Sequence, residues 1–290
     1  MQLPDSSSPS PFSGGAFRPI VVGALYPAVE RGLAADLAAV RALGGIAYPV
    51  CTLLLMAGRG TVTDATDVPE DTVRAQLEHL AETTKASAMK IGVLASHGTA
   101  EAVLSFADEF TGPVILDLQL SGPSGETVLT QRGIDVVMDR LGVPDLVIVG
   151  RSDAEPLSGG EIHSLDDAQV AAQRLVKRGA QSVVIKCGPL PARHFDTEGL
   201  DRPNGSHEDD EPFNADLYYD GETFALFEAP HLSEDVPAGA SSAFAIAALH
   251  ALARGESAEA ALQQAKRYTT EGLRASGPYS DAPFNFRWES

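Results

Sequence analysis

Residues 237–255 carry the clearest sign of chemistry in this sequence. They read P-A-G-A-S-S-A-F-A-I-A-A-L-H-A-L-A-R-G, in which the small-residue turn Gly239-Ala240-Ser241-Ser242 leads directly into an Ala-rich helix. The free N–H groups and the positive dipole end of such a helix can bind a phosphate, or a developing phosphoryl charge, without a side chain. The alternative is an ordinary helix start, in which Ser241 or Ser242 caps the helix and nothing binds.

The elements that must position this turn alternate along the chain. Short β-branched runs are separated by apolar residues at helical spacing. We expect strands at residues 20–24, 46–55, 88–94, 114–117, 146–149 and 182–186, and helices at 33–43, 69–84, 100–110, 130–141 and 165–178, before the last helix that ends at Gly255. Strands separated by helices in this way predict an α/β fold whose parallel sheet is covered on both faces.

Length and composition favour one soluble domain. The chain has 290 residues, of which 44% are hydrophobic, so it can bury one large core. We expect a mobile Ser/Pro/Gly-rich tail at residues 1–17 and a single domain at 18–290. No apolar run approaches 20 residues and no signal peptide is recognised, so we expect a cytoplasmic protein with no membrane partner.

The net charge limits the kinds of partner that the protein can bind, and the cysteines indicate the compartment. Asp and Glu total 40 against 21 Lys and Arg, for a net charge of −19. A field of that sign repels nucleic acid, which we therefore exclude as a partner. Cys51 and Cys187 lie far apart on predicted strands and fit buried thiols in a reducing compartment.

One long polar segment, residues 193–214, contains a run from His207 to Glu211. These His and carboxylate groups are adjacent rather than at ligand spacing, so a solvated loop is favoured over a metal site. The chain contains no G-x-G-x-x-G, Walker or G-x-S-x-G motif, which leaves P-loop and α/β-hydrolase chemistry without support.

Several segments between residues 20 and 274 match a known pattern. They are R-G-L-A-A-D-L-A-A-V-R-A-L-G (31–44), M-K-I-G-V-L (89–94), V-I-L-D-L-Q-L (114–120), V-V-I-K-C-G-P-L (183–190), A-D-L-Y-Y-D-G (215–221) and S-A-E-A-A-L-Q-Q-A-K-R-Y (257–268). With the helix to Gly255, they resemble the ribokinase-like superfamily and, within it, the hydroxymethylpyrimidine/phosphomethylpyrimidine kinases of thiamin synthesis. The related pyridoxal kinases share the fold and are the nearest competitors. The resemblance implies a three-layer α/β/α sandwich with a mostly parallel central sheet, ATP and Mg²⁺ as cofactors, a small-molecule substrate and a homodimer.

The resemblance also implies a nucleotide and metal site. Asp117 corresponds to the aspartate near the magnesium and phosphates, although it could be a simple turn residue. Lys186 corresponds to the lysine that approaches the nucleotide phosphates, with Gly188 beside it. Its alternative is a strand-end lysine with its head in solvent, but the carboxyl end of a parallel sheet is where ligands bind. The family's N-x-x-E has become G-R-S-D-A-E, in which Asp153 or Glu155 could serve the metal.

The substrate loops depart from the family. Its S-D-P-S-G-G-A-G loop is replaced by L-Y-P-A-V-E-R-G at residues 25–32, and its pyrimidine-reading glutamine by Ala57. Arg31 and Arg59 lie in these loops, and we expect them, with Val93, to bind a substrate that carries a phosphate. The alternative is that both arginines are exposed loop residues.

The catalytic turn departs as well. The family's G-T-G-C or G-A-G-D appears as G-A-S-S, so the position of the catalytic Cys or Asp holds Ser242, a poor base at neutral pH; an alignment shifted by two would place Ala240 there. We expect Gly239, Ser241 and Ser242 to act by positioning, because phosphoryl transfer depends mainly on orientation and charge. A phosphate monoester acceptor needs no base, so the sequence favours phosphorylation of a pyrimidine monophosphate to the diphosphate. The alternatives are a pyridoxal kinase-like enzyme and a non-catalytic ligand-binding relative.

Overall fold

The computed structural model describes residues 17–27, 31–58, 61–122, 125, 127–190, 213–232, 237–276 and 284–286. Its strands are β1 (Pro19–Leu25), β2 (Tyr48–Gly58), β3 (Thr61–Asp67), β4 (Ala88–Ile91), β5 (Val114–Leu118), β6 (Leu146–Gly150), β7 (Val183–Leu190), β8 (Phe213–Tyr219) and β9 (Phe224–Pro230). Its helices are α1 (Leu33–Ala42), α2 (Glu70–Thr83), α3 (His97–Asp108), α4 (Gln131–Asp139), α5 (Arg151–Ser158), α6 (Leu165–Lys177), α7 (Ala240–Ala253) and α8 (Ala258–Ser276).

All these strands join one sheet, in the order β3-β2-β1-β4-β5-β6-β7-β8-β9. The six strands from β2 to β7 in this order pair in parallel, whereas β3, β8 and β9 add antiparallel edges. The expectation of a mostly parallel sheet is therefore confirmed. Parallel pairing requires crossover connections, which bring the carboxyl ends of the central strands to the same edge.

The three antiparallel strands β3, β8 and β9 were not expected from the sequence. The side chains of residues 63–67 in β3 are all exposed, so this strand has no apolar face for a pattern to reveal. Strand β8 begins with the buried Phe213, inside the segment 193–214 that we expected to be a polar loop. Residues 193–212 of that segment lie outside the described residues.

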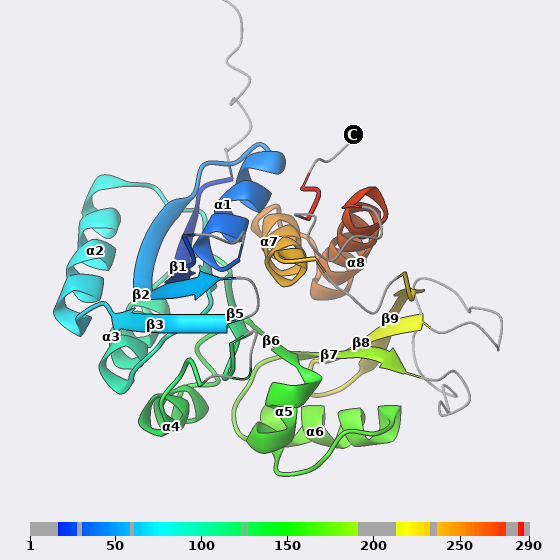
Figure 1. The fold of residues 1–290 in the computed structure, drawn as a ribbon. Helices are drawn as coiled ribbons and strands as arrows, with labels where there is room; N and C mark the ends of the chain where they lie inside the picture. The colour runs from blue at the N-terminus through cyan, green and yellow to red at the C-terminus, as the bar shows by residue number, and fades with distance from the viewer. Residues whose placement is uncertain are drawn as a thin grey trace, which may run out of the picture.

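Two layers of helices cover the sheet (Figure 1). Helices α1, α7 and α8 pack together on one face, and α2 to α6 lie on the other. Each face has its own apolar core, because side chains that alternate along a buried strand point to opposite faces. This arrangement is the three-layer α/β/α sandwich that we expected.

Helix α7 is the most enclosed helix of the first layer. It contacts α1, α8 and the central strands β4 and β5. Ten of its fourteen residues are buried, so it is apolar all round and shows no amphipathic stripe. This packing holds its first turn rigidly against the carboxyl ends of the central strands.

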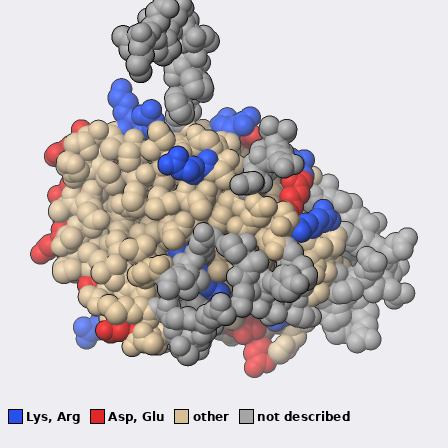
Figure 2. Space-filling view, turned by 45° about the horizontal axis from the view of Figure 1, so that its top comes forward, with Lys and Arg blue, Asp and Glu red and all other residues tan. Residues whose placement is uncertain are grey.

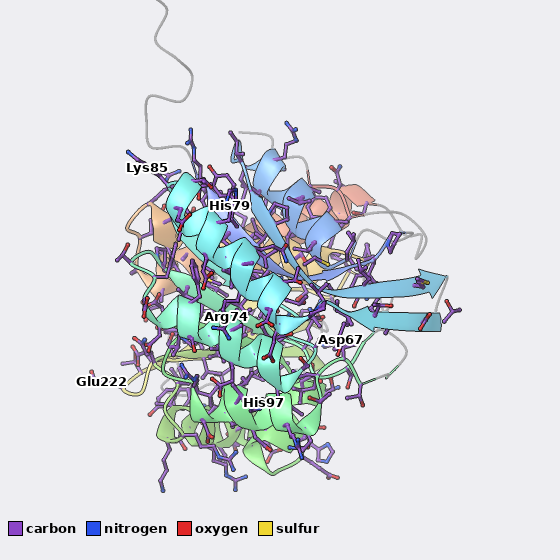
Figure 3. All side chains as sticks on the ribbon, turned by 90° about the vertical axis from the view of Figure 1, so that its left-hand side faces the viewer. Asp67, Arg74, His79, Lys85, His97 and Glu222 are labelled. Atoms are coloured by element: carbon purple, nitrogen blue, oxygen red, sulfur yellow. The ribbon has the colours of Figure 1, made fainter. Side chains whose placement is uncertain are left out.

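Figure 2 brings the α1, α7 and α8 layer forward. In this view uncharged atoms cover most of the described surface, separate Lys and Arg side chains stand on its upper part, and Asp and Glu side chains lie mainly near its margins. Figure 3 shows the β2–β3 hairpin projecting beyond the helices, and His79 and His97 placed apart on the outer layer. Within the described part of the chain, no helix is both long and apolar enough for a membrane span.

Candidate active site

A cavity of about 240 Å³ lies where the carboxyl ends of the central strands meet the start of α7. It is lined by Tyr26, Arg31, Gly32, Asp117, Leu118, Gln119, Ser121, Gly122, Gly150, Asp153, Lys186, Gly239, Ser241 and Ser242. The lining includes most of the residues predicted from the sequence as catalytic, nucleotide-binding or metal-binding. Chain segments more than 200 residues apart in sequence therefore meet at the position that open α/β sheets use for ligands.

The start of α7 is built by glycine rather than by a capping side chain. Gly239 occupies the N-cap with φ 97°, a conformation that residues with a Cβ rarely adopt, and no side chain caps the helix. The alternative interpretation, in which Ser241 or Ser242 is the cap, is therefore wrong. The positive end of α7 faces the cavity without a capping side chain in the way.

Lys186, Ser241 and Asp117 form the polar centre of the cavity. The Lys186 ammonium donates a short hydrogen bond to the Ser241 hydroxyl and lies 3.8 Å from Asp117 Oδ1. The Ser241 hydroxyl also donates to Asp117 Oδ1 at 3.4 Å. Lys186 is 24% exposed and Asp117 1%, so the lysine can reach a ligand while the carboxylate is held beneath it.

Asp153 and Glu155, the two candidate metal ligands, lie in the same helix but have different roles. Asp153 lines the cavity and accepts a hydrogen bond from the Leu120 amide at 3.3 Å. Burial raises its pKa, and the nearby Lys186 acts against this effect. The Glu155 carboxylate instead accepts from the Ile162 amide at 3.0 Å, which ties down the end of α5.

The donor set fits a magnesium ion that shares its ligands with phosphates. Mg²⁺ usually takes one or two carboxylates and completes its shell with water and phosphate oxygens. Asp117 and Asp153 are two carboxylates on one cavity wall. Among the described residues, no group of three or more His, Cys, Asp or Glu side chains forms a closed metal cage.

Two charged residues behind Asp117 were not assigned any role from the sequence. Lys90, in β4, lies 3.4 Å from Asp117 Oδ2 and 3.1 Å from Asp36 Oδ2, in α1. Burial acts to lower the pKa of Lys90, but the two carboxylates outweigh it and raise that pKa. For Asp36, burial raises the pKa more than Lys90 and Ser242 lower it. A lysine inside the apolar strand M-K-I-G was the available signal, because a buried ammonium requires a partner.

A second cavity, of about 250 Å³, adjoins the first. Lys186 and Ser241 line both. The other residues of the second cavity are mainly apolar: Gly188, Pro189, Asn214, Asp216, Ala229, Pro230, His231, Ala240, Phe244, Lys266, Thr269, Thr270 and Leu273. Gly188 has φ 70° and lies at a break in the β7–β8 register. Lys266 and Asp216, which also line this second cavity, form a 2.7 Å ion pair.

The opposite side of the first cavity contains one of the three expected substrate residues. Arg31 lines the cavity, together with Tyr26. Val93 does not line it: this residue is buried behind Tyr26 in a small apolar cluster, and its carbonyl accepts a 2.6 Å hydrogen bond from the Thr52 hydroxyl. Arg59 lies outside the described residues.

Comparisons with known proteins identify the family of this chain. A sequence model of the family described as phosphomethylpyrimidine kinase matches residues 30–282. The chain is similar to the hydroxymethylpyrimidine/phosphomethylpyrimidine kinase of Aquifex aeolicus, with 28% identity over 84% of this chain and 89% of that protein. The enzyme of the same name from Bacillus subtilis is 28% identical over 70% of this chain and 69% of that protein.

Solved structures share the fold. A pyridoxal kinase from Staphylococcus aureus in complex with AMP-PCP and pyridoxal matches with a TM-score of 0.77 and 22% identity, over 94% of each chain. A phosphomethylpyrimidine kinase from Clostridium difficile matches with a TM-score of 0.70 and 18% identity, over 88% of this chain and 98% of that one. The expected ribokinase-like α/β fold is thereby confirmed.

Proposed function

Because the chain belongs to the phosphomethylpyrimidine kinase family and is a phosphotransferase, we propose that it transfers a phosphoryl group from ATP to a pyrimidine monophosphate and forms the diphosphate. One observation carries the choice of acceptor. Lys186 and Arg31 line the same cavity as the uncapped start of α7. These two cations face the carboxylates of Asp117 and Asp153 in the same cavity. With Mg²⁺ held by those carboxylates, the two cations and the helix dipole would give the cavity positive charge for two anionic groups, inside a chain of net charge −19.

The two adjoining cavities suit the two parts of ATP. The lining of the second cavity is more apolar than that of the first, so it fits an adenosine. At the edge of this cavity Gly188 has no side chain and leaves open space beside the β7 backbone. The phosphates would then pass Lys186 and Ser241, which line both cavities, and end at the start of α7. The Lys186 ammonium has three N–H donors, so it can bind a phosphate oxygen while one donor stays on the Ser241 hydroxyl.

In phosphoryl transfer, the residues of the cavity act by positioning the reactants and by stabilising charge. Lys186 and the amide end of α7 stabilise the charge that develops on the transferred group. Asp117 and Asp153 would hold Mg²⁺, which when bound neutralises phosphate oxygens. Arg31 orients the acceptor by pairing with its phosphate, and Tyr26 encloses the ring side of the cavity.

An acceptor panel tests this function. Purified protein with ATP and Mg²⁺ is given the pyrimidine monophosphate, the pyrimidine alcohol or pyridoxal, and ADP release and the phosphorylated product are measured. We expect the highest kcat/KM with the monophosphate. A preference for pyridoxal would instead support the pyridoxal kinase-like alternative, and nucleotide binding without any product would support the non-catalytic one.

The same panel, run on Arg31→Ala, examines how the acceptor is held. A lost charge-assisted contact of roughly 1.5–3 kcal/mol raises the KM for the monophosphate about tenfold or more. The KM for ATP and the activity on the alcohol should change little. Arg41→Ala is the matched control, because it removes an exposed arginine from the end of α1. Equal KM values for the monophosphate in the Arg31→Ala and wild-type proteins would contradict this role.

Ser242 gives a second prediction. If the cavity works without a general base, Ser242→Ala should slow turnover of the monophosphate by less than about tenfold, whereas deleting a true base costs about 10²–10⁴-fold. Ser242→Asp should raise activity on the pyrimidine alcohol more than on the monophosphate. The new carboxyl would lie beside Asp36, and a neighbouring carboxylate raises a carboxyl pKa toward neutrality, where it is a better base. A drop of many thousand-fold in Ser242→Ala would show that the serine itself is essential.

The cytoplasmic location and the homodimer stay predictions. Gel filtration with light scattering would measure the assembly directly.

A further inference from the structure

The buried ion pairs behind the cavity connect five elements of the fold. Asp36 comes from α1, Lys90 from β4, Asp117 from β5, Lys186 from β7 and Ser241 from α7. Each is in contact with the next, through distances of 3.1 Å, 3.4 Å, 3.8 Å and a short hydrogen bond. The chain of contacts runs from a fully buried carboxylate to a lysine at the cavity surface.

The two oxygens of Asp117 face different lysines. Oδ2 faces Lys90, on the interior side, and Oδ1 faces Lys186, on the cavity side. The Ser241 hydroxyl lies between them, 3.4 Å from Oδ1 and 3.5 Å from Oδ2. A carboxylate is planar, so a partner that holds one oxygen also sets the direction of the other. Lys90 therefore orients the oxygen of Asp117 that faces the ligand.

Charge balance assigns Lys90 a task that Lys186 cannot perform. Lys186 is 24% exposed and faces the cavity, where a phosphate would compete with Asp117 for its ammonium, whereas Lys90 is 2% exposed and lines neither cavity. Without Lys90, the 1% exposed Asp117 carboxylate would depend on this shared lysine alone, and a buried carboxylate that lacks a cation is strongly unfavourable. Lys90 supplies Asp117 with a partner that the ligand does not share.

The surroundings of Lys90 are shaped for its ammonium. Asp36 holds it at 3.1 Å and is itself 0% exposed, with its second oxygen Oδ1 buried and unpartnered. Gly92 leaves the space: a Cβ there would lie 3.1 Å from Lys90 Nζ and 3.2 Å from the Val22 carbonyl oxygen. The M-K-I-G motif thus supplies both the lysine and the room for it.

We propose that Lys90, held by Asp36, is a positioning residue for phosphoryl transfer, which acts by orienting Asp117 at the phosphate end of the cavity. This inference rests on the proposed kinase function. It adds to that function two residues that line neither of the two cavities.

Three variants test the proposal against a purely structural role. Lys90→Met removes the ammonium and leaves Asp36 unpaired, so we expect both a lower Tm and a kcat that falls roughly 10²-fold, the usual effect of a misplaced catalytic group. The double variant Asp36→Asn/Lys90→Met removes both charges of the Asp36–Lys90 pair and leaves Asp117 with Lys186 alone, so it should regain part of the lost stability but not kcat, because Asp117 still lacks its interior partner. Gly92→Ala keeps every charge but displaces the ammonium, and should also lower kcat.

The readouts are Tm, kcat and the KM for ATP, with the acceptor that the wild-type protein uses best. Leu104→Ala, in the core on the other face of the sheet, is the control for lost stability alone, and it should lower Tm while kcat is kept. A double variant that regains wild-type kcat together with its Tm overturns the proposal, and so does a Gly92→Ala variant with wild-type kcat. Failure of the kinase function itself would be seen separately, as a wild-type protein that phosphorylates no acceptor.

Discussion

The Lys186→Met variant should bind ADP and ATP about 10- to 100-fold more weakly than the wild-type protein. This range corresponds to the roughly 1.5–3 kcal/mol of one hydrogen bond between a charged donor and a charged acceptor. Methionine keeps an unbranched side chain one atom shorter than lysine but removes the only charge that lines both cavities among the described residues. Isothermal titration calorimetry with each nucleotide measures the change, and kcat should fall as well because the same charge stabilises the transition state.

The matched control for this variant is Lys85→Met. Lys85 is exposed on the outer layer, just after α2 (Figure 3), so its replacement changes the net charge by the same amount far from the cavity. We expect wild-type nucleotide affinity in the control. Equal affinities in the Lys186→Met and wild-type proteins would contradict the nucleotide site proposed for the shared wall of the two cavities.

Replacing Asp117 by asparagine should separate binding from catalysis. The change is nearly isosteric and leaves Lys90 paired with Asp36 at 3.1 Å, so we expect the fold to hold. Loss of the carboxylate removes a ligand for Mg²⁺ and the anchor for Lys186, and kcat should fall by about 10²–10³-fold, as when a preorganised polar group is deleted. Binding of ADP without Mg²⁺ should be unchanged or tighter, since one negative charge near the phosphates is gone.

Calorimetry with and without Mg²⁺, alongside steady-state kinetics, measures both effects. Asp145→Asn is the control, because Asp145 accepts a hydrogen bond from the Val114 amide at 2.7 Å, at the start of β5 and away from the cavity. It should retain wild-type kcat. An Asp117→Asn variant with full activity would remove this carboxylate from the catalytic arrangement.

Local patterns in the sequence were enough to predict the helix and strand layers and the side of the cavity formed by Lys186 and Gly239. The helix and strand spacings are properties of neighbouring residues, and so are the apolar run before Lys186 and the small-residue turn before α7. Such signals survive in a single sequence because each element is stabilised in part by its own residues. The rule that ligands lie at the carboxyl edge of a parallel sheet then brought Lys186 and Gly239 to one place.

The tertiary structure decides which strands complete the sheet and which partners the buried charged residues have. Strand β3 is exposed and β8 begins in a polar segment, so their pairing depends on neighbouring strands rather than on their own pattern. The Asp36–Lys90 pair joins residues 54 positions apart, and no spacing along the chain predicts which carboxylate a buried lysine will meet. From the sequence, Ser241 could be either a capping residue or part of a phosphate-binding turn, and only the packing of α7 shows that its hydroxyl faces Lys186 and Asp117. Hydrophobic spacing is a local property, whereas the pairing of buried charges depends on which elements the whole fold brings within a few ångströms.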